Sequence, residues 1–485
     1  MTTIDTRLGK INGLDDGSVM TFLGVRYAEP PVGTKRFLPP TMVSPWKSTA
    51  DATQFPNRPM QPNVLSTMGQ PVSGKQDEDC LFLNIYTPSV EGQSRPVLVW
   101  IHGGSFTGGT ANEYDGSVLA QQGDVVVVTI NYRLGAFGFL NLEPLGEEFA
   151  GSASNGIRDQ ILALEWVREN IADYGGDPGN VTLFGESAGG TSILAMLAAP
   201  SADGLYHKAI AHSALVASQP PENNTDRLAE KLAVEKSGLG DKLRAMSAEE
   251  VLDLGISAGV FIDGMVITRS TYDAIREKGE AGVPLITGTN HDEGRLFTGP
   301  GEDGPAEHYA VGNRLLGVIV FHGADPTDYI TALNTSYPKN SARENHEQIW
   351  TDMFRRPCIG AAERATAAGP GGWLYRFDYE MPKKPGVRHL GATHASEMAF
   401  TFNTFANSDS HGFTFHDRSD PVTQQLALHW SGTILAMAKT GNPNGAGLPE
   451  WPAYDSETRQ SMILDAEPGV EQNVDASQQK TWGDS

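Results

Sequence analysis

A serine at position 187 stands between two glycines, Gly185 and Gly189, in a Gly-x-Ser-x-Gly pattern. The apolar run Val181–Phe184 before it predicts a short buried strand, and the small and apolar residues Thr191–Ala199 after it predict a packed helix. Between a strand and a helix, this pattern is typical of a turn so sharp that its flanking positions must lack bulk, which lifts the hydroxyl clear of the backbone. The sequence therefore predicts that Ser187 is a nucleophile.

A lone Gly-x-Ser-x-Gly pattern is weak evidence, because a chain with 54 glycines produces such spacings by chance. A second motif upstream strengthens the interpretation. The apolar run Pro96–Ile101 predicts a strand that leads into the glycine-rich stretch His102–Phe106. Only small residues let the main chain bring N–H donors close to a substrate oxygen on which negative charge develops. A His-Gly-Gly loop after a strand is the signature of oxyanion-binding loops in esterases and lipases of the α/β-hydrolase fold. We expect His102 to order this loop.

The composition bounds the kind of protein that carries these motifs. Of 485 residues, 39% are hydrophobic and 20% are charged, which describes an ordinary globular protein with a large core. The net charge of −23 argues against nucleic acid and against anionic membranes as partners. No repeat or low-complexity linker divides the chain, so we expect one domain over residues 1–485.

Few features of the sequence indicate where in the cell the protein is located. No signal sequence follows Met1 and no run of about 18 apolar residues occurs, so we expect a cytoplasmic protein without a membrane anchor. Its two cysteines, Cys80 and Cys358, lie in no Cys-x-x-Cys pattern, and the sequence does not tell a pair from two free thiols.

Several further stretches carry distinctive residue patterns. They are Thr21–Gly33, Glu78–Tyr86, His102–Gly104, Asn131–Gly135, Gly175–Pro178, Asn180–Thr182 and Phe184–Gly190. In this order they resemble the type-B carboxylesterase family, which also contains the cholinesterases, and bacterial carboxylesterases most closely. The resemblance runs from about residue 7 to about residue 465 and includes a helical pattern over 424–440 that ends at Gly441. It implies an α/β fold, the α/β-hydrolase fold, with a mostly parallel central sheet flanked by helices.

The resemblance also implies a catalytic triad in the chain order serine, acid, histidine. A serine needs a base within hydrogen-bond reach, and a carboxylate must orient that base. The family's acid falls on Glu293, after the strand-like 283–290, with Asp292 as the adjacent rival. The family's base falls on His394, after the strand-like 373–377, and His389 is the nearest competitor. His291 lies beside the acid and does not fit the chain order.

In this family, backbone N–H groups of the loop and of the residue after the serine form the oxyanion hole. Those positions are Gly104, Ser105 and Ala188. Many relatives have glycine where this chain has Ser105, which keeps the backbone donor and adds a hydroxyl. Secreted relatives pair the cysteine at position 80 with one near 54–61, where this chain has none, so that disulfide is absent here, in keeping with a reducing compartment.

Two helical, charged segments at about 219–260 and 296–350 follow the central strands. Insertions in an open α/β sheet lie at the carboxyl ends of its strands, over the catalytic residues. We expect these two to form the gorge or lid region with the acyl and alcohol pockets. The alternative is that their helices only pack and have no part in specificity.

The function implied is a serine carboxylesterase that hydrolyses small-molecule esters through an acyl-enzyme on Ser187, with no metal and no organic cofactor. An alternative is the same triad acting on carbamate or amide bonds. A non-catalytic, cholinesterase-like binding module is less favoured, because such members typically lack a triad residue and this chain has all three. A zinc site built on His394 and Glu397 has too few ligands in a recognisable spacing. The sequence makes no prediction of oligomeric state.

Overall fold

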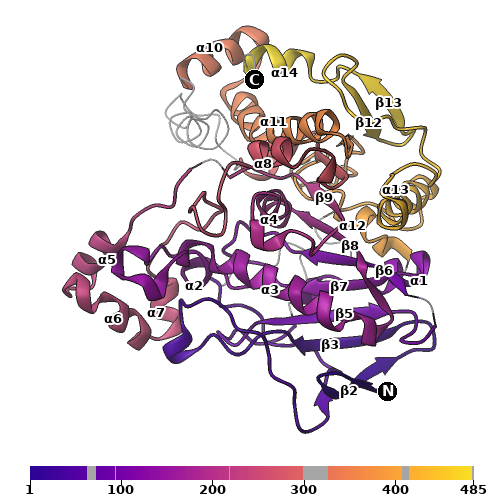
Figure 1. Ribbon diagram of the computed structural model, residues 1–485. Helices are drawn as coiled ribbons and strands as arrows, with labels where there is room; N and C mark the ends of the chain where they lie inside the picture. The colour runs from indigo at the N-terminus through magenta and orange to yellow at the C-terminus, as the bar shows by residue number, and fades with distance from the viewer. Residues whose placement is uncertain (63–72, 93, 218, 299–325, 407–413, 483–485) are drawn as a thin grey trace. The chain divides into compact units, whose positions relative to one another are not determined.

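The computed structural model describes residues 1–62, 73–92, 94–217, 219–298, 326–406 and 414–482 (Figure 1). The chain divides into two compact units. The first comprises Met1–Lys208 and Pro220–Arg269, and the second comprises Ala209–Gln219 and Ser270–Ser485. Among the described residues, no helix is long and apolar enough to cross a bilayer.

The strands of the first unit follow the order β1-β2-β3-β5-β7-β6-β8, and β4 pairs with β2. Their bounds are β1 (Thr2–Thr6), β2 (Gly9–Asp15), β3 (Met20–Arg26), β4 (Ala50–Asp51), β5 (Phe82–Thr87), β6 (Arg95–Ile101), β7 (Val126–Ile130) and β8 (Gly176–Glu186). β6 pairs in parallel with β7 and with β8, whereas β3 and β7 both pair antiparallel to β5. Every residue of β7 is buried, which explains its unbroken run of apolar and threonine side chains. Figure 1 shows β3, β5, β7 and β6 side by side.

Two α-helices of the first unit pack against the strand that leads into the serine turn. The α-helices are α1 (Ser117–Gly123), α2 (Gly135–Phe139), α3 (Asn155–Asn170), α4 (Ala188–Met196), α5 (Thr225–Lys231), α6 (Leu239–Ala245) and α7 (Ala248–Leu252). The short 3-10 helices are η1 (Gly33–Lys35), η2 (Ala111–Glu113), η3 (Glu143–Leu145), η4 (Glu147–Phe149), η5 (Ser152–Ser154), η6 (Ile171–Tyr174), η7 (Pro200–Ala202) and η8 (Lys236–Gly238). α4 packs against β8 and β6, and α3 packs against β8. Every residue of α4 is buried, and the hydroxyls of its two polar residues, Thr191 and Ser192, donate to backbone carbonyls.

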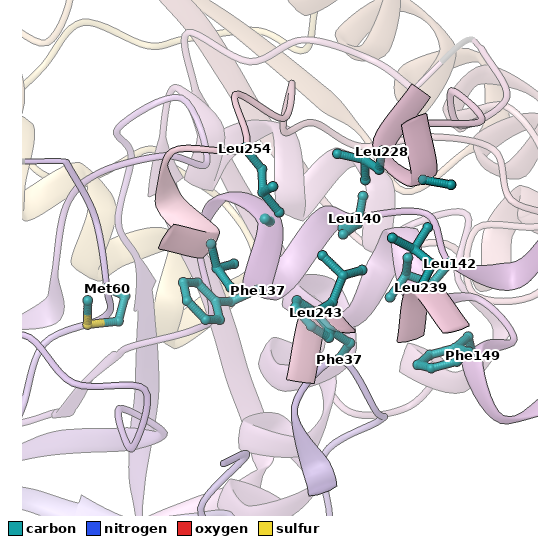
Figure 2. Packing of buried hydrophobic residues seen from close by; sticks show 13 residues of the cluster. Phe37, Met60, Phe137, Leu140, Leu142, Phe149, Leu228, Leu239, Leu243 and Leu254 are labelled. Carbon is teal, nitrogen blue, oxygen red and sulfur yellow. The ribbon is translucent and has the colours of Figure 1, made fainter. Parts of the chain in front are cut away.

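The predicted insertion at about 219–260 forms α5, α6 and α7 and has a small hydrophobic core of its own with α2 and η4. Figure 2 shows this cluster. Leucines of the insertion, Leu228, Leu243 and Leu254, are buried there with Phe137 of α2. Of the second predicted insertion, 296–350, residues 299–325 lie outside the described part of the chain.

The strands of the second unit are β9 (Lys208–His212), whose first residue belongs to the first unit, β10 (Leu285–Asn290), β11 (Gly372–Phe377), β12 (Gln460–Leu464) and β13 (Gly469–Gln472). β9, β10, β11 and β12 pair in parallel in that order, and β13 is antiparallel to β12. The α-helices are α8 (Thr271–Lys278), α10 (Pro326–Ser336), α11 (Ala342–Ala368), α12 (Met398–Thr401), α13 (Pro421–Thr440) and α14 (Ala476–Trp482). The 3-10 helices are η9 (Gly279–Ala281), η10 (Glu293–Leu296) and η11 (Thr404–Ala406). The long helix α11 packs against β10 and β11.

The elements predicted around the motifs are confirmed. The strands expected before the serine, the glycine loop and the candidate acid and base are β8, β6, β10 and β11. The helix expected over 424–440 is α13, which begins three residues earlier because Asp420 caps it and Pro421 is its first residue. It ends at Gly441, whose φ of 76° is left-handed.

Candidate active site

Ser187 lies in the turn between β8 and α4, in a strained conformation with φ 55° and ψ −116°. A non-glycine residue adopts such angles only where its surroundings leave no alternative. The helix that follows supplies the constraint, since a Cβ built on Gly189 would lie 1.9 Å from the carbonyl oxygen of Ile101 at the end of β6. The carbonyl of Ser187 accepts hydrogen bonds from the backbone N–H and the hydroxyl of Thr191, each 2.8 Å long. The turn therefore has the geometry of a nucleophile elbow.

The glycine loop lies directly against this turn. A Cβ built on Gly103 would lie 2.8 Å from the carbonyl oxygen of Glu186 and 3.2 Å from Cβ of Ser187, so only glycine allows the approach. Beyond it, Gly104 has φ 108° and Ser105 has φ 55°, which turn the main chain sharply. The backbone N–H of Gly108 closes the loop on the carbonyl of Gly104 at 2.9 Å.

The side chain of His102 is part of the structure that supports the loop. Its Nδ1 lies 2.8 Å from the carbonyl oxygen of Gly103, and its ring stacks on Tyr132 with the centroids 4.5 Å apart. The hydroxyl of Tyr132 donates to the carbonyl of His102 at 2.9 Å. Burial lowers the pKa of His102 to about 4, although the hydrogen bond to Gly103 acts in the opposite direction. His102 is therefore neutral near pH 7 and orders the loop, as the sequence predicted.

Three backbone N–H groups near Ser187 are candidates for binding a developing oxyanion. They belong to Gly104, Ser105 and Ala188, the positions predicted from the sequence. Within the part of the chain that the structure describes, no protein acceptor takes a hydrogen bond from any of the three. Ala188 is the first residue of α4, so its N–H also lies at the positive end of the helix dipole.

The candidate acid and base are in direct contact within the second unit. Nδ1 of His394 lies 2.5 Å from Oε2 of Glu293. Glu293 begins η10 after β10, and His394 lies in the loop after β11, so each side chain follows the carboxyl end of one of two adjacent parallel strands. Glu293 is 0% exposed and His394 is 5% exposed, so solvent competes little for this bond.

The rivals considered from the sequence have other partners. Asp292 contacts Arg295 at 3.1 Å and accepts a hydrogen bond from the backbone N–H of Ala392 at 3.1 Å. The ring of His389 bonds the carbonyl of Met381, and the side chain of His291 is half exposed. Of the two adjacent acids, it is Glu293 that contacts His394.

Two buried polar residues, Ser213 and Asn290, which no sequence pattern predicted, complete the surroundings of Glu293. The hydroxyl of Ser213, just after β9, donates to Oε1 of Glu293 at 2.5 Å. The backbone N–H of Asn290 donates to the same oxygen at 2.7 Å. Burial raises the pKa of Glu293, but the charge of His394 and the hydrogen bonds outweigh it, so the pKa lies below its usual value. Glu293 is therefore held ionised, as an orienting acid must be.

A third buried residue near the acid is Glu397, which the sequence suggested only as a weak candidate metal ligand. It is fully buried, and its carboxylate accepts hydrogen bonds from Nδ2 of Asn290 at 2.7 Å and from the hydroxyl of Tyr375 at 3.0 Å. Asn290 thus bridges the two carboxylates of Glu293 and Glu397, with 3.3 Å to the first. Glu397 belongs to the hydrogen-bond network behind the acid.

Aromatic rings pack on the candidate base. The centroid of the His394 ring lies 5.0 Å from that of Phe297 and 4.7 Å from that of Phe354 on α11. These ring contacts restrict the rotation of the imidazole, and the hydrogen bond with Glu293 sets its orientation. Of the predicted site residues, Ser187 and the glycine loop belong to the first unit, and Glu293 and His394 belong to the second.

Comparison with known proteins gives consistent similarities. A profile described as the carboxylesterase family matches residues 1–482. Para-nitrobenzyl esterase of Bacillus subtilis (strain 168) is 36% identical over 502 aligned positions, which cover 98% of this chain and 97% of that protein. Cocaine esterase of Homo sapiens is 32% identical, over 97% of this chain and 88% of that protein.

Solved structures are similar over the same length. The crystal structure of a carboxylesterase of Geobacillus stearothermophilus has a TM-score of 0.86 and 35% identity and covers 100% of both chains. A thermophilic PNB esterase has a TM-score of 0.88 and 33% identity and covers 99% of this chain and 100% of its own.

Proposed function

This chain belongs to the carboxylesterase family, and we propose that it hydrolyses carboxylic esters through an acyl-enzyme on Ser187. It is a carboxylic ester hydrolase with the α/β-hydrolase fold, a mostly parallel central sheet flanked by helices, so the predicted family and fold are confirmed. The mechanism and the role of each residue are the proposal. The observation that carries it is the strained turn at Ser187 with the main chain of Gly103 lying against it.

In the proposed mechanism, His394 takes the proton of Ser187 as the hydroxyl attacks the ester carbonyl. Glu293 holds the tautomer in which Nδ1 carries the hydrogen, and its charge stabilises the imidazolium that forms. His394 then donates a proton to the leaving alcohol. Water repeats the cycle on the acyl-enzyme and releases the acid.

The charge that develops on the carbonyl oxygen is held by the backbone N–H groups of Gly104, Ser105 and Ala188. Their lack of acceptors among the described residues supports this role. Preorganised donors of this kind need no rearrangement when the tetrahedral intermediate forms, and each one contributes on the order of 3 kcal/mol to its stabilisation.

We propose small-molecule esters as the substrates. The names of two relatives, para-nitrobenzyl esterase and cocaine esterase, support esters of small organic molecules as the first class to test. We also propose a cytoplasmic location, supported by Cys80 and Cys358, which are both free and buried. Cell fractionation with an antibody to the protein tests the location.

The test of the nucleophile combines labelling with kinetics. Wild type is treated with an organophosphonate, its adduct is mapped by peptide mass spectrometry, and hydrolysis of short and long p-nitrophenyl esters is measured alongside. We expect one adduct, on Ser187, with matching loss of activity, and neither adduct nor turnover in folded Ser187→Ala.

Ser105→Ala is the matched control, because it removes a nearby hydroxyl and keeps the backbone donor. We expect it to be labelled on Ser187 like wild type. Turnover in Ser187→Ala, or a label that Ser105→Ala abolishes, would show that the nucleophile is assigned wrongly. Amide or carbamate turnover faster than ester turnover would favour the alternative substrates.

A further inference from the structure

The main chain of the glycine loop is strained at two successive residues. Ser105 and Phe106 have φ of 55° and 59°, in the left-handed region that costs free energy for any residue except glycine. Such backbone persists only where the surrounding structure holds it in place. The amides of Gly104 and Ser105 belong to this stretch, so whatever fixes Phe106 also fixes their direction.

Two contacts that fix Phe106 come from α2. Gly135, the first residue of the helix, donates its backbone N–H to the carbonyl oxygen of Phe106 at 2.7 Å. Phe139, the last residue, places its ring 5.0 Å from the ring of Phe106, with 59° between the planes. The first and the last residue of this short helix both contact Phe106, so α2 supports the loop. The two rings are buried.

Phe139 is in turn held by α3. A Cβ built on Gly156 would lie 2.4 Å from Cζ of Phe139, so the ring is pressed directly against the helix backbone. The same helix carries Asp159, whose carboxylate accepts two hydrogen bonds, 2.8 and 2.7 Å long, from the guanidinium of Arg133. Arg133 lies two residues before α2, so its ion pair with Asp159 links the start of α2 to α3. The ring of Phe139 therefore has little freedom to move.

The neighbouring aromatic residue of α2 has a different environment. Phe137 stacks on Phe37, with 6.2 Å between the centroids, and belongs to the hydrophobic cluster of the insertion helices (Figure 2). Phe137 and Phe139 are 5% and 2% exposed. They have the same side chain, the same helix and similar burial, but of the two it is Phe139 that contacts Phe106. Substitution of each phenylalanine in turn therefore separates the effect of lost core packing from the effect of lost support for the loop.

We propose that Phe139 is a positioning residue for ester hydrolysis. Acting through Phe106, it holds the amides of Gly104 and Ser105 in the direction that the oxyanion of the tetrahedral intermediate requires. The inference rests on the proposed function, since it assigns support to the proposed oxyanion hole. Phe139 stabilises the transition state more than the bound ester, because the charge develops only in the transition state.

The test compares Phe139→Leu with Phe137→Leu in the full chain. We expect Phe139→Leu to lower kcat on the order of tenfold with KM within about twofold, because a misdirected donor costs less than a removed one. Phe137→Leu should keep kcat within about twofold, although both variants lower the thermal midpoint as large-to-small core changes do. A loss of stability alone would affect both variants and would not produce this difference in kcat between them.

A transition-state analogue gives a second readout. A trifluoromethyl ketone forms a hemiketal on the serine whose oxyanion occupies the hole. We expect Phe139→Leu to weaken its inhibition by the same factor as kcat/KM. Phe106→Leu and the double variant complete a cycle, and the effect of Phe139→Leu should largely vanish in the Phe106→Leu background.

The inference is overturned if folded Phe139→Leu keeps the wild-type kcat, if Phe137→Leu loses as much, or if the effects of the cycle add. If Phe139→Leu does not fold, Gly156→Ala is the alternative variant, because its added methyl group displaces the same ring from α3. We expect Gly156→Ala to lower kcat without raising KM. An unchanged kcat in this variant also overturns the inference. An active wild type labelled on Ser187 leaves the proposed function standing in these cases. A wild type with neither turnover nor adduct overturns both.

Discussion

The hydroxyl of Ser213 donates a hydrogen bond of 2.5 Å to Oε1 of Glu293, the carboxylate oxygen that does not face His394. Both residues are fully buried, and they lie 80 positions apart in the chain. The bond favours the charged form of the acid, in opposition to burial. Ser213 therefore helps to keep Glu293 in the state that orients the base.

We expect Ser213→Ala to lower kcat by about tenfold, since a hydrogen bond to a charged group contributes roughly 1.5 to 3 kcal/mol. Losing this donor raises the pKa of Glu293, so the acid limb of the pH-rate profile should move to higher pH. The measurement is kcat against pH for a p-nitrophenyl ester.

Ser396→Ala is the matched control for this change. Ser396 is also fully buried in the second unit, but its hydroxyl has no hydrogen-bond partner among the described residues. We expect Ser396→Ala to leave the profile in place. A shift of equal size in both variants would mean that Ser213 acts only through packing.

Glu293→Gln should lower kcat by roughly 10³ to 10⁴, because the amide favours the wrong tautomer of His394 and lacks the charge that stabilises the imidazolium. Asp292→Asn should cost less than about tenfold, since the carboxylate of Asp292 bonds Arg295 and the amide of Ala392. Kinetics of both variants, with circular dichroism to check folding, tests the choice of acid. The reverse order of effects would assign the role to Asp292.

Local patterns in the sequence predicted the parts of the site that lie within one strand and the loop after it. The apolar strand before Ser187 and the glycines around it determine the turn, because no bulkier residues fit there. The pairing of Glu293 with His394 followed from the family resemblance, and the structure contains it. The catalytic roles of these residues stay predictions.

Other parts of the site have no local pattern. Ser213 contacts Glu293, and Glu397 contacts Asn290, only because parallel strands bring the ends of distant segments together. A single serine after a strand is too common to predict such a contact. The leucines of the 219–260 segment predicted helices, but their partner, α2, is set by tertiary packing. Whether this segment walls the substrate pocket stays a prediction.

Ser105→Gly tests the strain in the glycine loop. The side chain of Ser105 is exposed, and its φ of 55° costs about 1 kcal/mol that glycine avoids. Glycine also loses about 0.5 to 1 kcal/mol through the entropy of the unfolded chain, so we expect a thermal midpoint at or slightly above that of wild type. Because the backbone donor is kept, kcat should stay within about threefold.

Ser105→Val is the opposite change, because a β-branched side chain is strongly disfavoured at positive φ. We expect this variant to lose both stability and kcat. A large loss of kcat in Ser105→Gly, with the fold intact, would instead assign the hydroxyl a direct part in catalysis.

We expect Asp352 on α11 to make the stability of the protein depend on pH. Its carboxylate is fully buried and accepts hydrogen bonds from the hydroxyl of Tyr329 at 2.5 Å and from Nε2 of Gln348 at 2.7 Å. Burial raises the pKa of Asp352 to about 6 from 3.8, against the effect of these bonds and of the nearby charge of Arg355.

The raised pKa of Asp352 fixes the direction of this pH dependence. Between pH 3.8 and 6 the folded state binds more protons at this site than the unfolded state, so its contribution to the free energy of unfolding falls as pH rises. The total change is about 3 kcal/mol and is complete above pH 6.

Asp352→Asn removes this titration, because the amide resembles the protonated acid at every pH. We expect the variant to match wild type near pH 4 and to exceed its stability by about 1 to 3 kcal/mol at pH 8. Differences in thermal midpoint from wild type, measured across this range, cancel the other titrating groups. A constant difference for Asp352→Asn would mean that the buried carboxylate stays ionised throughout.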